Sequence, residues 1–262
     1  MKRILITGAN SYIGTSFERY IKENYPDDYQ IDTLDMLNPN WKDYDFTGYD
    51  TVFHVAGIAH QKETKENAHL YYEVNRDLAV ETAKISKNAR VKQFILMSSM
   101  SVYGLNCSDE LINLQTSTHP KTNYGMSKLE AEIEIQKFID KDFVVSILRP
   151  PMVYGDNCPG NLTRLFKTVK KFHVFPTIKN ERSSITVEKL SKEIKRAVDE
   201  CSSKIYLPQN DKYMCTYDIV KKQMQKENIK VLFIPIFNPL IKLLIGKQSL
   251  LTKMFGDLKY ER

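Results

Sequence analysis

The most informative chemical groups in the sequence are a phenol and an amine four residues apart. Tyr124 and Lys128 belong to the run Tyr-Gly-Met-Ser-Lys, and on a helix this spacing places both side chains on one face. A free tyrosine titrates near pH ~10 and is a poor base at neutrality, whereas a nearby ammonium stabilises the phenolate and lowers its pKa. We therefore expect the pair to move the proton of a substrate hydroxyl while hydride moves at the attached carbon. An incidental pair on a surface helix is the alternative.

A serine in a second segment supports this interpretation. Ser99 follows the strand-like residues 93–97, in the run Met-Ser-Ser-Met-Ser-Val-Tyr-Gly. The carboxyl end of such a strand is where a parallel sheet meets its ligands. We expect Ser99 to hydrogen-bond the reacting oxygen and hold it against the phenol. Ser98 and Ser101 are the competing candidates.

Residues 4–14, Ile-Leu-Ile-Thr-Gly-Ala-Asn-Ser-Tyr-Ile-Gly, have the pattern of a buried strand, a turn and the start of a helix. Gly8 permits the tight turn, Gly14 permits close packing of the helix on the strand, and the helix N-terminus attracts a pyrophosphate. Ser11 stands where a third glycine is usual, and its hydroxyl can donate to phosphate. A plain strand-to-helix turn is the alternative. The cofactor-binding residues predicted here are Gly8, Asn10, Ser11, Tyr12, Ile13 and Gly14.

An aspartate indicates which dinucleotide binds. Asp35 follows a second strand-like segment, residues 29–34, and no arginine comes directly after it. A carboxylate at this place accepts both ribose hydroxyls of NAD and repels the 2′-phosphate of NADP. The sequence therefore favours NAD over NADP. A solvated loop aspartate is the alternative.

Strand-like and helix-like segments alternate through the first half of the chain. This order predicts an α/β fold with a doubly wound parallel sheet of the Rossmann type. We expect a cofactor-binding domain over residues 1–155 and a small, reduced substrate-binding part over 156–262 that is interleaved with it. The expected strands are 3–7, 29–34, 51–55, 93–97, 143–148 and 204–207, and the expected helices are 13–24, 71–89, 124–139, 162–171 and 187–198.

Composition excludes several other classes of protein. The net charge of +6 comes from 38 basic and 32 acidic residues that are scattered, whereas a nucleic-acid binder concentrates its excess in a stripe. A mild positive field suits an anionic substrate such as a nucleotide sugar. The four cysteines form no Cys-x-x-Cys pair and lie at no zinc-ligand spacing, so we expect free thiols, a reducing cytoplasm and no metal.

No segment predicts a membrane span. The apolar run after Met1 is too short for a signal peptide. The most apolar stretch, residues 231–245, is interrupted by Pro235, Pro239 and Lys242. We expect it to form a packed C-terminal helix, with contact to a membrane surface as the alternative.

Taken together, these segments resemble the extended short-chain dehydrogenases/reductases, the nucleotide-sugar epimerase/dehydratase family. The resemblance covers about residues 2–190, and its pieces occur in the order of the family. They are Thr7-Gly8 to Gly14, Asp35, His54-Val55-Ala56-Gly57, Asn75, Ser99 before Val102-Tyr103-Gly104, Tyr124 with Lys128, and Leu148-Arg149-Pro150 before Val153-Tyr154-Gly155.

The resemblance implies catalytic roles for three residues. Tyr124 would be the catalytic acid/base, and Lys128 would activate it and bind the cofactor ribose. Ser99 would bind the reacting hydroxyl of the substrate, with Tyr124 beside it. A nucleotide-diphosphate sugar would be the substrate, and family members often form homodimers through the helices around Asn75 and Tyr124.

The resemblance implies further contacts to cofactor and substrate. Ala56 and Gly57 would let the cofactor lie against the end of the third strand, and Asn75 would support the site. The backbone from Pro150 to Val153 would contact the nicotinamide. Arg182, in the run Arg-Ser-Ser-Ile-Thr-Val, is similar to the arginine that grips the substrate diphosphate, although the aromatic residue and histidine usual in that motif are absent. A solvated arginine is the alternative.

Three activities of the family differ in what they require. A 4,6-dehydratase needs an acid and a base directly after the serine, whereas Met100 and Ser101 follow Ser99. A 4-epimerase that transfers hydride at C4 through a 4-keto sugar needs only Ser99, Tyr124 and Lys128, and so does an NAD(P)H-dependent 4-ketoreductase. Asp35 favours the epimerase, with the reductase as the alternative. The short C-terminus keeps a third hypothesis open, an idle NAD-binding sensor.

Overall fold

The computed structural model describes residues 1–59, 61 and 63–262, which form two compact units. The first unit comprises Met1–Gly104, Ser117–Gly155 and Ile185–Pro208, and the second comprises Leu105–Thr116, Asp156–Ser184 and Gln209–Arg262. Residues 185–208 belong to the first unit because their helix packs on its sheet.

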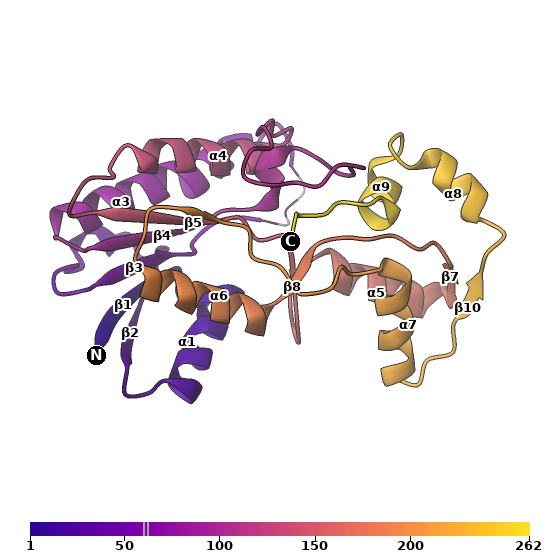
Figure 1. Cartoon of the computed structure of the whole chain (residues 1–262), viewed down its shortest axis with the longest axis horizontal. Helices are drawn as coiled ribbons and strands as arrows, with labels where there is room; N and C mark the ends of the chain where they lie inside the picture. The colour runs from indigo at the N-terminus through magenta and orange to yellow at the C-terminus, as the bar shows by residue number, and fades with distance from the viewer. Residues whose placement is uncertain (60, 62) are drawn as a thin grey trace. The chain divides into compact units, whose positions relative to one another are not determined.

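The first unit is built on a six-stranded parallel sheet (Figure 1). The strand order is β2-β1-β3-β4-β5-β9, and every neighbouring pair is parallel. This confirms the predicted α/β class and doubly wound sheet. The strands are β1 (Lys2–Thr7), β2 (Tyr29–Leu34), β3 (Thr51–His54), β4 (Gln93–Met97), β5 (Val144–Leu148) and β9 (Ile205–Tyr206), and a separate two-stranded sheet joins β6 (Met152–Tyr154) to β8 (Ser184–Thr186).

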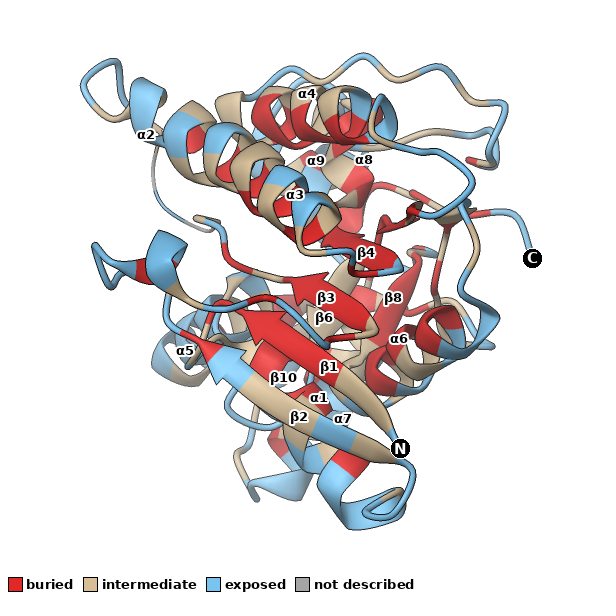
Figure 2. Ribbon diagram, turned by 90° about the vertical axis from the view of Figure 1, so that its left-hand side faces the viewer, coloured by how far each residue is buried: buried red, intermediate tan, exposed pale blue. Residues whose placement is uncertain are grey.

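Helices cover both faces of this sheet (Figure 1). α1 (Tyr12–Asn24) and α6 (Val187–Glu200) pack on one face, and α3 (Leu78–Asn88) and α4 (Asn123–Gln136) pack on the other. The central strands are buried along most of their length, and β2 at the edge is partly exposed (Figure 2). This burial on two faces explains why the central strands are runs of Ile, Leu, Val and Phe rather than alternating patterns.

The helix expected over residues 71–89 is interrupted. The structure has α2 (Ala68–Tyr72), a π-helical turn (Glu73–Asp77) and then α3. A π turn inserts one extra residue into a helix and is frequent at functional sites. This turn carries Asn75, which is buried.

The second unit has its own small core. Its elements are α5 (Asn161–Phe172), β7 (Val174–Pro176), α7 (Thr216–Lys226), β10 (Leu232–Ile234), α8 (Asn238–Leu244) and α9 (Ser249–Phe255), with β7 and β10 paired in parallel. The core includes Val169, Phe175, Val220 and Phe255.

The prediction of a packed helix over residues 231–245 is wrong. The stretch forms β10 and then the short α8. Pro235, which has no backbone donor, lies between the two elements, and Pro239 stands in the first turn of α8, where a helix tolerates it. No residue of α8 is buried. In the described chain, no helix is long and apolar enough to cross a membrane.

Candidate active site

The glycine loop lies at the point where the strand order reverses. The chain runs from β1 outward to β2 and returns to β3 on the other side, so the loops after β1 and β3 border the crevice in which doubly wound sheets bind ligands. Gly8 has a φ of +115°, and a Cβ there would lie 2.6 Å from the backbone nitrogen of Ala56. A Cβ on Gly14 would lie 3.2 Å from side-chain atoms of Ile6 and Val55. Both glycines therefore allow the close approaches that the sequence predicts.

Ser11 has a local role that the sequence interpretation missed. It is the N-cap of α1, and its Oγ accepts a hydrogen bond of 3.1 Å from the Gly14 amide. Because a hydroxyl can accept and donate at once, this cap leaves the O–H available to a phosphate. Asn10 before it has a φ of +66°, and Tyr12 and Ile13 open the helix. The loop is thus held by caps and turns that present the helix N-terminus.

Two aspartates near β2 have different surroundings. Asp35 is exposed at the end of β2, where its Oδ1 accepts from the Leu37 amide at 2.9 Å. Asp32 is instead used within the fold, because it accepts from the Tyr49 hydroxyl at 2.9 Å and lies 3.6 Å from an Arg3 nitrogen. Asp35 is therefore the carboxylate of β2 that a ribose could reach.

Ser99 and Tyr124 are brought together. The Ser99 side chain lies close enough to the Tyr124 phenol to lower its pKa, although the two residues lie 25 positions apart in the chain. Ser99 also accepts from the Ser101 amide at 3.1 Å, while Ser98 is buried and donates to Glu132. Of the three serines considered, Ser99 is thus the one placed against the phenol.

The pKa of Tyr124 moves against the expectation. Burial raises the pKa of the phenol, and the nearby Ser99 hydroxyl lowers it by a smaller amount. The expected lowering by Lys128 is wrong in this arrangement, because the Lys128 amine donates to the Met97 carbonyl, at 3.0 Å, instead of to the phenol. The phenol is therefore protonated at neutral pH here.

Lys128 is a buried cation in the middle of the candidate site. Burial lowers its pKa to about 8, and the nearby Glu132 carboxylate partly offsets this effect. Within the described part of the chain, the Met97 carbonyl is the hydrogen-bond acceptor that Nζ reaches. An ammonium has three donors, so two remain for hydroxyls of a ligand.

His54 at the end of β3 adds no charge to the same region. Burial and the nearby Lys128 charge lower the pKa of its imidazole to about 3, so it is neutral. One ring nitrogen lies 2.8 Å from the Thr7 hydroxyl, and Nε2 is buried without a partner among the described atoms.

Asn75 and Gly57 form a cradle beside Lys128. The Asn75 amide accepts from the Ile58 backbone N–H at 2.9 Å, and donates to the Ile58 carbonyl at 3.1 Å and to Ser127 Oγ at 3.3 Å. A Cβ on Gly57 would lie 2.7 Å from Asn75 Oδ1 and 3.1 Å from Lys128 Nζ. Gly57 is exposed, so the missing side chain leaves an accessible space lined by an amide and an ammonium. These residues fit the ribose–nicotinamide part of a dinucleotide.

The segment after β5 contributes backbone to the first unit. Pro150 is buried, and its carbonyl accepts from the Met100 amide at 2.9 Å, which ties the end of β5 to the residue after Ser99. Val153 lies in β6 and packs partly against the core of the first unit.

A buried ion pair was not predicted from the sequence. Arg149 and Glu132 form a bidentate contact, with Nε 3.1 Å from Oε1 and Nη2 2.5 Å from Oε2, and their side chains are 7% and 1% exposed. Arg149 also donates to the Tyr103 hydroxyl at 3.0 Å. Glu132 lies one helical turn after Lys128, so this pair fixes the charge that faces the buried ammonium. The arginine of the run Leu-Arg-Pro and the glutamate four residues after Lys128 are visible in the sequence, but nothing in the sequence indicates that they pair.

Glu63 is a second residue that the sequence interpretation missed. Its carboxylate accepts from the backbone amides of Asn123 and Tyr124, at 3.0 and 3.2 Å, at the start of α4. The Thr122 hydroxyl caps the Gly125 amide of the same turn. A carboxylate at a helix N-terminus is favoured by the dipole, so Glu63 helps to fix the helix that presents Tyr124.

Arg182 belongs to the second unit and is half-buried. Its Nη1 donates to the Gly256 and Asn106 carbonyls, at 2.6 and 3.2 Å, and burial lowers the pKa of the guanidinium. Its backbone pairs with Met214 and Leu258. One nitrogen is therefore engaged within its own unit, so Arg182 is not simply a solvated side chain.

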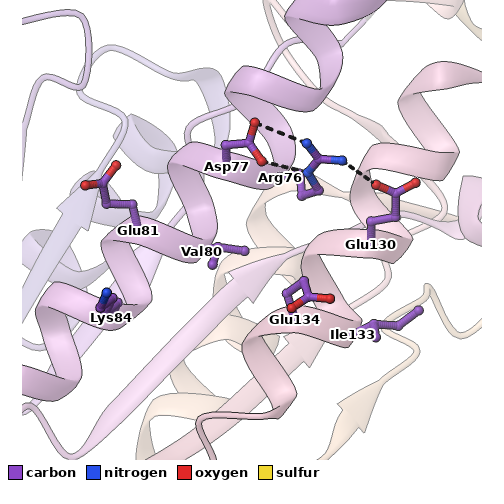
Figure 3. A pocket seen from close by; sticks show the side chains of 8 residues that line it. All are labelled: Arg76, Asp77, Val80, Glu81, Lys84, Glu130, Ile133 and Glu134. Carbon is purple, nitrogen blue, oxygen red and sulfur yellow. Dashed lines mark hydrogen bonds and ion pairs between the residues drawn. The ribbon is translucent and has the colours of Figure 1, made fainter.

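A hollow of about 710 Å³ is lined by the π turn, α3 and α4 of the first unit (Figure 3). Its central arginine, Arg76, is paired with Asp77 and Glu130, at 2.6 and 2.7 Å. It includes none of the candidate catalytic residues. Its lining is Arg76, Asp77, Val80, Glu81, Lys84, Glu130, Ile133 and Glu134.

Comparison with known proteins identifies the family to which the chain belongs. The model of the NAD dependent epimerase/dehydratase family matches residues 4–187, and the chain belongs to this family. It is therefore an enzyme with a Rossmann-type cofactor domain, as the sequence predicts.

Among individual proteins, the chain is 27% identical to the UDP-glucose 4-epimerase of Vibrio cholerae, over 99% of this chain and 87% of that protein. Its fold resembles the UDP-glucuronic acid 4-epimerase of Bacillus cereus in complex with NAD, with a TM-score of 0.77 and 16% identity over 99% and 89% of the two chains. It also resembles the dTDP-4-dehydrorhamnose reductase of Bacillus anthracis in complex with NADP, with a TM-score of 0.73 and 21% identity over 90% and 84%.

Proposed function

We propose that the chain is an NAD-dependent nucleotide-sugar 4-epimerase that acts at C4 through a 4-keto sugar. The observation that carries this proposal is that the Ser99 side chain lies close enough to the Tyr124 phenol to lower its pKa, while the buried Lys128 follows one turn later on the same helix. A sugar hydroxyl needs one group to hold its oxygen and another to exchange its proton, and these residues supply both.

Each residue has a defined task in this proposal. Ser99 hydrogen-bonds the C4 oxygen and fixes its position against the phenol. Tyr124 takes the proton from that oxygen and returns it when the hydroxyl is restored. Lys128 would leave the Met97 carbonyl to bind a ribose of the cofactor. Its positive charge would then stabilise the phenolate of Tyr124 and lower the pKa of the phenol. Because burial raises the pKa of Tyr124, this lowering is what makes the phenol competent as a base.

The dinucleotide would lie along the crevice between the loops after β1 and β3. The glycine loop from Gly8 to Gly14 would hold the pyrophosphate, Asp35 the adenosine ribose, and Lys128 with Asn75 the other ribose. Ala56, Gly57, Pro150 and Val153 would line the nicotinamide. When it is bound, NAD would accept the hydride that leaves C4 of the sugar. The exposed Asp35 carboxylate, which has no cation paired to it among the residues that the structure describes, supports NAD rather than NADP.

A 4-ketoreductase is the second candidate function. The same three residues serve it, because a reductase needs the proton donor and the oxygen-holding serine in one direction only. The relative from Vibrio cholerae, which matches nearly the whole chain, supports the epimerase. The reductase of similar fold, which binds NADP, supports the 4-ketoreductase as the alternative that experiment must test.

The proposal extends to the substrate and the assembly. Residues 1–155 would bind the cofactor and the later residues the nucleotide-diphosphate sugar, with Arg182 holding the diphosphate through the nitrogens that are not engaged with Gly256 and Asn106. The surface of α3 and α4 around Arg76 would join two copies in a homodimer.

The nucleotide that the purified protein carries separates the two functions. The protein is denatured and the released nucleotide is identified by chromatography and mass. About one NAD per chain, with turnover of a nucleotide sugar and no added reductant, supports the epimerase. An empty protein that consumes NADPH or NADH with a 4-keto nucleotide sugar would make it a reductase.

A further inference from the structure

The second unit exposes a run of large apolar side chains. Ile236 is 75% exposed, Leu243 64% and Phe237 53%. They lie on and next to α8, which follows β10 along the chain (Figure 1). The exposed set in this part of the unit is Phe172, Val174, Leu232, Ile236, Phe237, Leu240, Leu243 and Leu250.

These side chains are not the ones that hold the unit together. Along β10, Val231 and Phe233 pack against the core, while Leu232 between them faces outward next to Val174 of the paired strand. In α8, Ile241 packs inward, as does Ile245 just after the helix, whereas Leu240 and Leu243 stay exposed. An ordinary surface strand or helix carries polar residues on its outer face. Both faces are apolar here, so the outer face is available to a partner.

The segments that carry this face are rich in cations. Residues 157–178 and residues 228–256 each contain four lysines or arginines and no aspartate or glutamate, although Lys170 pairs with Glu227 just outside these ranges. Lys242 and Lys247, beside the exposed leucines, are exposed and have no carboxylate partner within the described chain. Scattered single apolar residues need no explanation, but eight exposed large apolar side chains on and next to β7, β10, α8 and α9, with two cations among them that lack a carboxylate partner in the described chain, do.

We propose that this apolar–basic face, formed by Phe172, Val174, Leu232 and residues 236–250, docks on the surface of an anionic phospholipid bilayer. The apolar side chains would enter the boundary between headgroups and acyl chains, and the lysines would contact the lipid phosphates. The short α8 lies on such a surface and does not cross it. The proposal is independent of the reaction that the first unit catalyses.

Sedimentation with sucrose-loaded vesicles tests this docking. The full-length protein is mixed with vesicles of phosphatidylglycerol and phosphatidylcholine, or of phosphatidylcholine alone. We expect at least about tenfold tighter binding to the anionic vesicles, and weakening as the ionic strength rises from about 0.1 M to about 1 M, where the Debye length falls from about 10 Å to about 3 Å. Equal binding to both vesicles, or none, would overturn the proposal.

Two sets of variants separate the apolar from the charged contribution. The triple change Ile236→Ser, Phe237→Ser and Leu243→Ser, and the double change Lys242→Glu and Lys247→Glu, should each weaken binding at least about tenfold. All five side chains are exposed, so we expect the variants to stay folded, and circular dichroism checks this.

Matched controls use exposed residues elsewhere. Leu114→Ser removes an apolar side chain that is 54% exposed, and the double change Lys92→Glu and Lys141→Glu alters the charge by the same amount in the first unit. Both should leave binding within about twofold. If the lysine control weakens binding as much as the change of Lys242 and Lys247, net charge explains the loss, and if Leu114→Ser weakens it as much as the triple change, the loss is not specific to this face; either result would make the proposal wrong. If the triple variant instead turns an oligomer into monomers in sedimentation velocity, the face joins copies of the chain and the proposal is wrong.

Discussion

Replacing Lys128 by methionine should stabilise the protein at neutral pH, although it removes a residue of the candidate active site. The amine is buried, and its pKa is about 8 rather than 10.5. Below about pH 8 the folded chain keeps a charge in a place that disfavours it, while the unfolded chain keeps the same charge in water. As pH rises from about 8 to 10.5 the folded chain loses its proton first, and the free energy of unfolding of the natural protein rises.

The size of the effect follows from this difference in pKa. A shift from 10.5 to about 8 corresponds to roughly 3 kcal/mol of destabilisation below pH 8. Methionine has a similar length and no charge, so this cost disappears in the variant. The Met97 carbonyl loses its hydrogen bond of 3.0 Å, which costs about 1 kcal/mol. We therefore expect Lys128→Met to unfold with a free energy about 2 kcal/mol higher at neutral pH.

Urea unfolding of both proteins measures this difference. The transition is followed by tryptophan fluorescence and circular dichroism at several pH values between about 7 and about 10.5, and the two free energies are subtracted. The advantage of the variant should shrink through this window and reverse at its upper end. Lys141→Met is the control, because the Lys141 side chain is 89% exposed, and it should change stability by less than about 0.5 kcal/mol at any pH.

Two results would refute this reasoning. A variant that is less stable than the natural protein at pH ~7 would mean that Lys128 is held by contacts worth more than its burial costs. A stability difference that does not depend on pH would mean that the pKa of the amine is not lowered. Either result would also argue against the inference that the buried ammonium of Lys128 lowers the stability of the protein while it serves the site.

Three further substitutions test other parts of the site. Asp35→Ala should weaken NAD binding by about tenfold and NADP binding much less, measured by calorimetry, and the opposite order would undo the cofactor assignment. Glu132→Gln should lower the free energy of unfolding by about 3 kcal/mol in urea, because Arg149 is left buried without its partner; a change under about 1 kcal/mol would show that the pair is replaceable. Ser99→Ala should lower kcat by about 10²-fold with cofactor affinity unchanged, while Ser101→Ala should have little effect; the reverse pattern would make Ser101 the oxygen-holding residue.

Much of the first unit could be predicted from sequence, for a physical reason. Its strands are short apolar runs ended by Gly, Asp or Pro, and burial on two faces leaves few other interpretations. β2 and β4 have the predicted bounds, and β1, β3 and β5 differ by one residue. The loops after these strands then meet at one edge, so the order of motifs was enough to bring Ser99 and Tyr124 together.

Other features depend on contacts that have no local signature. The π turn at Asn75 is stabilised by hydrogen bonds to Ile58 and Ser127, which are distant in sequence. The Glu132–Arg149 pair joins α4 to the end of β5 and appears only when both elements are packed. In the second unit, apolar residues face outward as well as inward, so the pattern of residues 231–245 resembled a packed helix.

The central claim is that Tyr124 exchanges the proton of a sugar hydroxyl, and Tyr124→Phe tests it most directly. The change removes one oxygen and keeps the ring. Turnover of a nucleotide sugar and the affinity for NAD are measured side by side in the two proteins. We predict that kcat falls by about 10²- to 10⁴-fold while the Kd for NAD changes by less than about twofold. A variant that retains a kcat close to that of the natural protein would contradict the account.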